Sequence, residues 1–262
     1  MTKKILSIFA IIAVVITSSI VLSGCRIRTV HGRGDMTDRT FEVGNFNAIN
    51  VSGAYRVAFS YDTDTSLEVA MQENLFEHFR VSVRNNTLYV SSRRNFTTTS
   101  TNTPRLYITA PSLVGVNFSG STRTTDWDKI ETDATFTIRT SGSSRINIEV
   151  EANRLDIRSS GSSNMNIEMD VDRLDVNLSG SSNMTFNGTA EIVTIVISGS
   201  GRVYGLGLET DNTTLTVSGS GRIYISVSNT LVVTISGSGR VRYLGNPTIT
   251  QQISGSGSIQ RV

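Results

Sequence analysis

Cysteine and histidine are scarce in this sequence, and their scarcity excludes several kinds of site. The 262-residue chain has one cysteine, Cys25, and two histidines, His31 and His78. A single thiol cannot form a disulfide within the chain, and neither histidine has a second histidine or a cysteine at the spacing of a metal site. We therefore expect no internal disulfide, no bound metal and no cofactor.

The motifs of common catalytic chemistry are also missing. Serine is abundant, but no Gly-x-Ser-x-Gly elbow precedes a helical segment, and no phosphate loop with Gly-Lys-Ser/Thr occurs. The calcium-binding repeats of other solenoids need aspartate after a glycine-rich corner, where this chain has arginine or asparagine. We predict that the protein has no catalytic residue and is not an enzyme.

The sequence lacks a strong excess of basic charge. It has 24 Lys and Arg residues against 22 Asp and Glu residues, and two of the lysines, Lys3 and Lys4, lie in the first 25 residues, which contain no acid. The remainder of the chain therefore has no net charge. Nucleic-acid binding proteins usually have a basic surface, so we expect no nucleic-acid partner.

The first 25 residues have the features of a targeting segment. Lys3 and Lys4 precede an apolar run from Ile5 to Val21, and Leu22-Ser23-Gly24-Cys25 ends it. These four residues resemble the bacterial lipoprotein signal, in which the cysteine is acylated with palmitate-type chains. Each buried methylene of such a chain contributes about 0.8 kcal/mol to membrane attachment. A chance cysteine beside a signal cleavage site, or an uncleaved anchor helix, are the alternatives.

This resemblance predicts the location of the protein. A lipid on Cys25 would attach the chain to a membrane of the cell envelope. We expect an outer-membrane lipoprotein that faces either the periplasm or the outside of the cell.

A short phrase repeats along the second half of the chain. Ser-Gly-Ser, followed by Thr, Ser or Gly, occurs eight times at intervals of 18 to 22 residues. Such a constant period is typical of repeat architectures in which each unit stacks on its neighbours. The phrases begin at Ser119, Ser141, Ser160, Ser179, Ser198, Ser218, Ser236 and Ser254.

Each repeat alternates apolar and polar residues on both sides of the Ser-Gly corner. Leu174, Val176 and Leu178 precede one corner, and Met184 and Phe186 follow it. This pattern predicts a strand, a tight corner, a second strand and a variable corner where changes in length occur, at 187–191 or 226–230. The corner glycines would supply positive φ and let successive backbones stack closely.

Three arrangements could hold these units. An antiparallel meander would leave an apolar face, and this half of the chain has no amphipathic helix to cover it. A flexible Ser-Gly linker would not alternate with apolar strands at a fixed period. We therefore predict an all-β fold, a parallel β-solenoid of about 19-residue coils with an irregular N-terminal β cap.

The remaining segments complete the predicted domain organisation. Residues 1–25 form the signal peptide, 26–40 a flexible tether, and 41–262 a single domain with its cap and first strands in 41–111 and its regular repeats in 112–262. Within the cap we expect an early copy of the repeat corner at Ser52-Gly53 and a hairpin turn at Asn85-Asn86. The tether also contains Arg33-Gly34-Asp35, a tripeptide that chance produces in many chains.

Two short segments of the predicted cap, together with the repeated Ser-Gly corners, resemble a known family. Phe46 to Gly53, Tyr107 to Leu113 and the Ser-Gly-Ser-Gly corners resemble the putative auto-transporter adhesin head GIN domain family over about residues 40 to 258. The resemblance implies a right-handed parallel β-helix-like fold, exposure in the cell envelope and an adhesive role. It supplies no established catalytic residue.

A solenoid would bring residues of successive coils together on its surface. The fourth residue after the first serine of each phrase would form one column, and the sixth would form a second column beside it. Arginine, tyrosine and asparagine suit sugar hydroxyls, carboxylates or a protein partner. A solvated edge that discourages aggregation is the alternative. The predicted binding residues are Arg145, Asn164, Asn183, Arg202, Tyr204, Arg222, Tyr224 and Arg240.

A further stack would contain Asp156 and Asp175, like the acidic pairs of solenoid polysaccharide lyases and hydrolases. Arg139 and Arg158 would lie diagonally beside them, so ion pairing is the simpler interpretation. We predict a lipid-anchored envelope protein whose solenoid acts as an adhesin or ligand-binding surface for a glycan or a cell-surface protein. The alternatives are a structural or stress-related envelope component without an external ligand and a polysaccharide-active enzyme.

Overall fold

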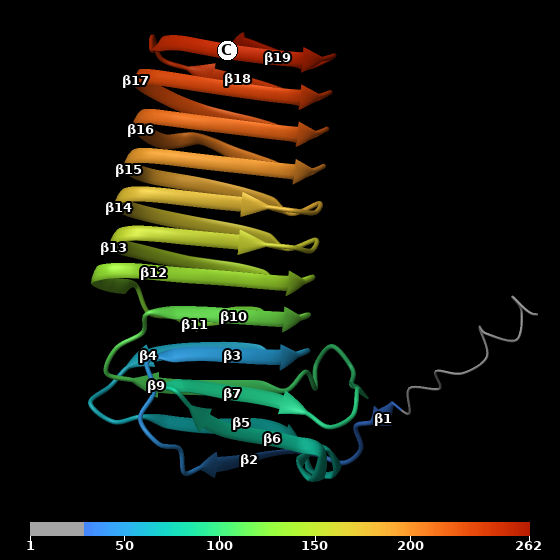
Figure 1. The fold of residues 1–262 in the computed structure, drawn as a ribbon. Helices are drawn as coiled ribbons and strands as arrows, with labels where there is room; N and C mark the ends of the chain where they lie inside the picture. The colour runs from blue at the N-terminus through green and yellow to red at the C-terminus, as the bar shows by residue number, and fades with distance from the viewer. Residues whose placement is uncertain (1–28) are drawn as a thin grey trace, which may run out of the picture.

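The computed structural model describes residues 29–262, in which the chain is all β apart from one short 3-10 helix. Its coils lie one above another in a single stack, with the N-terminal segments at one end (Figure 1). The predicted signal peptide and Cys25 lie outside the described residues. Within residues 29–262, no helix has the length and hydropathy needed to cross a membrane.

The regular coils form the upper part of the stack. From β13 to β17, each long strand begins after a Ser-Gly corner, bends through the variable corner and ends at or just before the next Ser-Gly corner, whereas β12 begins only at Ile130, beyond β11 (Arg123–Trp127). Successive strands pair in parallel, and Val176 is the register partner of Ile195. The parallel solenoid is therefore confirmed, and the meander is excluded. The strands are β12 (Ile130–Gly142), β13 (Arg145–Ser159), β14 (Asn164–Leu178), β15 (Asn183–Gly199), β16 (Arg202–Gly219) and β17 (Arg222–Gly237).

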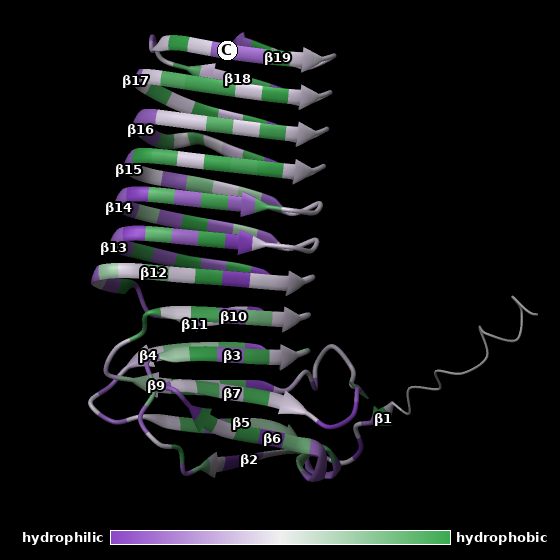
Figure 2. Cartoon of the chain, in the orientation of Figure 1, coloured by the Kyte–Doolittle hydropathy of each residue, from purple (hydrophilic) through white to green (hydrophobic). Residues whose placement is uncertain are grey.

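The coils form two faces that enclose one core. Each long strand contributes to both faces. We call the strand segments that precede the Ser-Gly corners sheet 1, and the strand segments that follow these corners sheet 2. Along β14, buried and exposed residues alternate, and Ile167, Leu174 and Val176 are almost fully buried. Figure 2 shows the same alternation as green and purple bands along the strands. Burial of these side chains between the sheets is the main stabilising contribution, at about 25 cal/mol per Å² of apolar surface.

The Ser-Gly corners stack through their glycine backbones. A Cβ on Gly161 would lie 2.1 Å from the carbonyl oxygen of Gly142, and one on Gly219 would lie 2.7 Å from that of Gly199. Gly219 also has a φ of +127°, which L side chains rarely adopt. Close backbone stacking therefore requires glycine at the corners of successive coils, as predicted. The predicted positive φ is found at only some corners and is absent from Gly142, Gly161 and Gly180.

The first coils lie below the regular ones. In sheet 1, Ser119 pairs with Ser52 and Gly120 with Gly53, so Ser52-Gly53 is an early copy of the corner as predicted. A coil outside the recognised repeats therefore lies within the segment 41–111. The strands of these coils are β3 (Ala48–Gly53), β4 (Arg56–Tyr61), β10 (Gly115–Gly120) and β11 (Arg123–Trp127).

A cap covers the lower end of the core. Its strands pair partly antiparallel, and the hairpin between β6 and β7 turns at Asn85 and Asn86, whose φ values are +47° and +54°. This is the turn that the Asn-Asn pair predicted. The cap elements are β5 (Ser66–Gln72), η1 (Glu73–His78), β6 (Phe79–Arg84), β7 (Thr87–Ser92), β8 (Phe96–Thr97) and β9 (Arg105–Ala110).

The prediction of a flexible tether is wrong for the described part of that segment. The short strand β1 (Val30–His31) pairs in parallel with β8, and β2 (Met36–Phe41) pairs antiparallel with β5 over its whole length. The physical reason is that β5 would otherwise present unpaired backbone groups at the end of the stack, and β2 satisfies them. The solenoid thus begins with an edge that its own N-terminal strand covers.

The last strands continue the two sheets at the opposite end. β18 (Arg240–Leu244) and β20 (Ser258–Arg261) extend sheet 2, and β19 (Thr248–Gly255) extends sheet 1, all in parallel register. The register places Arg240 directly above Arg222. Sheet 2 therefore runs from the cap to the last coil, with the single register pair Arg123–Arg145 joining β11 to β13.

Candidate functional site

The predicted surface column exists on sheet 2, next to the Ser-Gly corners. Register pairs link Arg145 to Asn164, Asn164 to Asn183, and Asn183 to Arg202. Arg222 and Arg240 continue the same line. Since neighbouring parallel strands lie about 4.8 Å apart, each side chain adjoins the next. The structure thus brings together six predicted residues that lie up to 95 positions apart in sequence.

The column extends further than the sequence prediction. Below Arg145 lie Arg123, then Arg56, then Arg105, each the register partner of the next. Arg56 and Arg123 are also the fourth residues after Ser52 and Ser119, so the offset used for the other coils could have found them. Arg105 follows no Ser-Gly corner, and only the pairing of β9 with β4 places it here. We call these nine residues the arginine column: Arg105, Arg56, Arg123, Arg145, Asn164, Asn183, Arg202, Arg222 and Arg240.

Within the part of the chain that the structure describes, the guanidinium groups of the arginine column have no acidic partner. Among residues 29–262, none of its seven arginines forms a salt bridge. Two of them donate side-chain hydrogen bonds to neutral acceptors: Arg56 Nη2 donates to the Ser100 carbonyl at 3.2 Å, and Arg202 Nη1 donates to Asn183 Oδ1 at 3.5 Å. Like charges on adjacent strands repel, so the column retains an uncompensated positive potential.

Amides separate the two runs of arginine. Asn183 Nδ2 donates to Asn164 Oδ1 at 3.3 Å, and in the adjacent column Asn166 Nδ2 donates to Asn147 Oδ1 at 2.8 Å. Each amide has further donors and acceptors that face solvent. The middle of the face is therefore neutral and rich in hydrogen-bonding groups.

The predicted tyrosines lie beside the upper run of arginine. The rings of Tyr204 and Tyr224 stack with centroids 5.3 Å apart and an interplanar angle of 14°. The Arg242 guanidinium lies 6.0 Å from the Tyr224 ring centroid, on the next coil. Each tyrosine ring therefore covers one face of the other ring. The ring edges and the hydroxyl groups remain available to a ligand.

Acidic residues lie on the same face but at the opposite edge. Glu149 follows Arg145 by four residues along β13, which places them about 13 Å apart. At that edge the Lys129 ammonium lies 2.6 Å from Glu151, 3.6 Å from Glu149 and 3.7 Å from Glu131. The hydrogen bond with Glu151 is the main cause that raises the pKa of Lys129. Sheet 2 therefore has a basic edge and an acidic edge.

Sheet 1 holds the predicted pair of aspartates, and arginines neutralise both. Asp156 accepts two hydrogen bonds from Arg158, at 3.1 and 3.3 Å. Asp175 accepts two from Arg173, at 2.8 and 3.0 Å, and its Oδ2 also lies 2.8 Å from Arg154. Burial raises the pKa of Asp175, but its hydrogen bonds with Arg173 and the charge of Arg154 outweigh this effect and leave the pKa below its usual value.

The predicted partners of these aspartates are partly wrong. Arg158 does pair with Asp156, but Arg139 forms no ion pair within the described chain, and Asp175 pairs with Arg154 and Arg173 instead. Arg173 lies two residues from Asp175 on one strand, and its side chain therefore reaches the carboxylate on the same face. Arg154, the register partner of Arg173, reaches the same carboxylate from the diagonal position on the adjacent coil.

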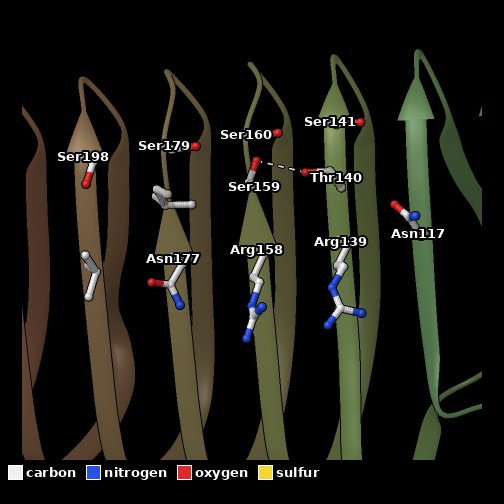
Figure 3. Close-up of a pocket in the computed structure, with 12 residues that line it drawn as sticks. Asn117, Arg139, Thr140, Ser141, Arg158, Ser159, Ser160, Asn177, Ser179 and Ser198 are labelled. Carbon is white, nitrogen blue, oxygen red and sulfur yellow. Dashed lines mark hydrogen bonds between the residues drawn. The ribbon is translucent and has the colours of Figure 1, made fainter.

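A shallow groove of about 390 Å³ lies beside this cluster on sheet 1. Figure 3 shows Arg139 and Arg158 side by side between Asn117 and Asn177, below the serines of the corners. Behind them, Thr140 Oγ1 donates to Ser159 Oγ at 2.9 Å. The groove has only two arginines, and Asp156 already engages one, so it has much less free positive charge than the arginine column.

No set of three or more His, Cys, Asp or Glu side chains in residues 29–262 has a geometry that could hold a metal ion. His78 is the last residue of η1, and its Nε2 lies 3.0 Å from Glu77 Oε1; His31 lies in β1. Neither histidine is near the arginine column in the sheet register.

Comparison with protein families gives one match that spans most of the chain. The family model described as "Putative auto-transporter adhesin, head GIN domain" matches residues 45–168 and again 137–247. The two matches overlap and together include the coils from β3 to β17. No curated protein matches the chain in sequence.

Solved structures share the fold. A putative adhesin from Parabacteroides distasonis ATCC 8503 is 22% identical, with a TM-score of 0.81, over 89% of this chain and 100% of that chain. A putative lipid binding protein from the same organism is 23% identical, with a TM-score of 0.79, over 90% and 100%. A putative adhesin from Parabacteroides merdae ATCC 43184 is 24% identical, with a TM-score of 0.76, over 89% and 99%. At these identities the likeness establishes the fold alone.

Proposed function

Because the chain belongs to the putative auto-transporter adhesin, head GIN domain family, we propose that it is a cell-envelope adhesin that binds its ligand along the arginine column. The observation that carries this proposal is the line of seven guanidinium groups without an acidic partner in the described chain. Like-charge repulsion within the column costs stability. A ligand that brings negative charge or hydrogen-bond acceptors would remove that cost.

The geometry of the face fits a binding role. Sheet 2 is a rigid support whose register fixes the spacing of the column residues, and rigid elements position binding groups better than loops do. Tyr204 and Tyr224 add hydroxyl groups beside the upper arginines, and Asn164 and Asn183 add amides between the two runs. The face can therefore form many weak contacts in parallel, as adhesion to an extended surface requires.

Attachment to the envelope is the second part of the proposal. Lipidation of Cys25 would place the protein on an outer membrane, with the cap nearest the lipid, because the cap contains the N-terminal strands β1 and β2. Labelling cells with a palmitate analogue tests this part. We expect label on the wild-type protein and none on Cys25→Ala. Protease treatment of intact cells then shows whether the solenoid faces outward.

The binding role is tested by removing the upper run of arginine. We expect Arg202→Ser/Arg222→Ser/Arg240→Ser to lose attachment to an array of immobilised glycans and extracellular-matrix proteins while its circular dichroism spectrum stays unchanged. Arg84→Ser/Arg93→Ser/Arg94→Ser removes the same charge from the cap and is the matched control. Equal binding by all three proteins would favour a structural envelope component without an external ligand.

A polysaccharide-active enzyme has weaker support than an adhesin. Glycoside hydrolysis needs a carboxylic acid with a raised pKa that can donate a proton. Asp175 has a lowered pKa, and both of its oxygens accept hydrogen bonds from arginine. The simplest role of Asp156 and Asp175 is to neutralise the arginines that surround them on sheet 1.

A further inference from the structure

The arginine column has a spacing and a length that specify a class of ligand. Its nine positions occupy successive coils, and at about 4.8 Å per coil they span roughly 38 Å along the stack. The arginines fall into a lower run of four, Arg105 to Arg145 in stacking order, and an upper run of three, Arg202 to Arg240. A single small anion would meet two or three of these groups, whereas a linear polymer could meet all seven.

We propose that the arginine column binds a linear acidic polysaccharide, with carboxylate or sulfate groups, that lies parallel to the solenoid axis. This inference rests on the proposed binding role of the same face and names its ligand. Guanidinium groups form two parallel hydrogen bonds to such oxoanions. The neutral hydroxyl groups of the polymer would meet the amides of Asn164 and Asn183 and the hydroxyls of Tyr204 and Tyr224.

The column does not suit a single-stranded nucleic acid. Such ligands bind by stacking their bases on exposed aromatic faces beside a basic groove. Here the Tyr204 and Tyr224 rings stack with centroids 5.3 Å apart, which leaves no space for a base between them, and the Arg242 guanidinium lies over the Tyr224 ring. The aromatic pair therefore offers edges and hydroxyl groups rather than a stacking platform.

A flat anionic membrane also fits less well. The column is one residue wide until Arg242 lies beside Arg240, and on the same face Glu149 and Glu168 lie about 13 Å from Arg145 and Asn164. A planar anionic surface would contact both edges and be repelled by one of them. A narrow polymer can follow the basic edge alone.

The test uses the full chain and heparin-derived oligosaccharides of increasing length. We expect affinity to rise with length until the polymer spans the column, and to fall with salt because binding releases counterions. Arg202→Ser/Arg222→Ser/Arg240→Ser and Arg56→Ser/Arg123→Ser/Arg145→Ser should each weaken binding of the long oligosaccharide at least tenfold and lower the salt slope. Arg84→Ser/Arg93→Ser/Arg94→Ser should retain the wild-type affinity.

Other results overturn the inference. Affinity that is independent of oligosaccharide length, or that both column variants retain, would show that the column does not hold a polymer. Tighter binding of oligo-dT or of vesicles with one-quarter phosphatidylglycerol than of heparin oligosaccharides would assign the face to nucleic acid or membrane. If heparin fails to compete while the column variant still loses attachment to the glycan and matrix array, the proposed function stands and only this ligand class is wrong.

Discussion

At the residue scale, the last residue of each corner is matched in size to the residue that precedes the corner of the coil below. Ser182 ends one corner and contacts Ser159, whereas Gly201 ends the next corner and lies against Leu178. The serines of the lower corners bond to one another: Ser159 and Ser182 hydroxyls lie 2.7 Å apart, and the Ser163 amide donates to Ser182 at 3.0 Å. Upper corners replace this polar contact by isoleucine or valine against glycine. The change from Ser-Gly-Ser-Ser to Ser-Gly-Ser-Gly therefore has a packing cause.

This packing predicts the effect of a methyl group at one corner. A Cβ on Gly221 would lie 2.7 Å from Ile197 Cγ2 and 3.2 Å from Val217 Cγ1. We expect Gly221→Ala to lower the free energy of unfolding by about 1–3 kcal/mol, measured by urea denaturation. In an Ile197→Ala background the same change should cost less. An equal cost in both backgrounds would contradict the proposed clash.

The pair of aspartates predicts a pH dependence. Asp175 has a lowered pKa in the folded state, so its ion pairs stabilise the fold above the unfolded value, about 3.9, and this stabilisation is lost as the pH falls. Since Arg154 and Arg173 are largely exposed, we expect Asp175→Asn to cost only about 1 kcal/mol at pH 7. Denaturation at pH 7 and pH 3 should show this difference shrink. Glu168→Gln, which removes a carboxylate without an ion pair in the described chain, is the control.

At the element scale, each coil contacts only its neighbours, and this determines what the sequence could reveal. The Ser-Gly spacing predicted the register of the regular coils, including the pairing of Val176 with Ile195. It could not predict Arg105, because β9 joins sheet 2 after the chain has reversed direction in the cap. It also missed β2, whose residues do not alternate clearly and pair only because β5 offers an open edge.

The places where coils change length were only partly predicted. A register shift occurs between Val227 and Thr230, within the predicted corner, but none occurs at 187–191. Instead β16 has one extra residue relative to β15 and three relative to β17 near Leu206, which is exposed, while Leu208 is buried. A bulge inserts one residue and keeps the others in register, so this position leaves little trace in the apolar pattern.

Because each coil contacts only its neighbours, we predict that the protein folds after the deletion of one whole coil. Deleting residues 160–178 joins Ser159 to Ser179 and keeps the corner phrase and the column offset. We expect this variant to fold with a β circular dichroism spectrum and lower thermal stability, because coil stability is a sum of nearest-neighbour terms. Deleting residues 160–171 removes part of a coil and should abolish the cooperative transition. Failure of both deletions alike would contradict a stack of equivalent coils.

At the scale of the whole molecule, the charge distribution matters more than the net charge. Acidic and basic residues almost balance in composition, yet sheet 2 separates them into a basic edge at the Ser-Gly corners and an acidic edge at the variable corners. Composition alone could not indicate this separation, since it depends on which side of each coil a residue occupies. The proposed binding role depends on the arginines being direct neighbours on successive coils.

Disulfide formation between column positions tests that arrangement most directly. In a Cys25→Ser background, we expect Arg202→Cys/Arg222→Cys to form a disulfide on mild oxidation, because register partners on adjacent strands lie within the Cα separation of 4.4–6.8 Å that a disulfide spans. Arg145→Cys/Arg202→Cys, three coils apart and so about 14 Å distant, should stay reduced. An oxidised distant pair with a reduced adjacent pair would contradict the stacked column and with it the proposed binding face.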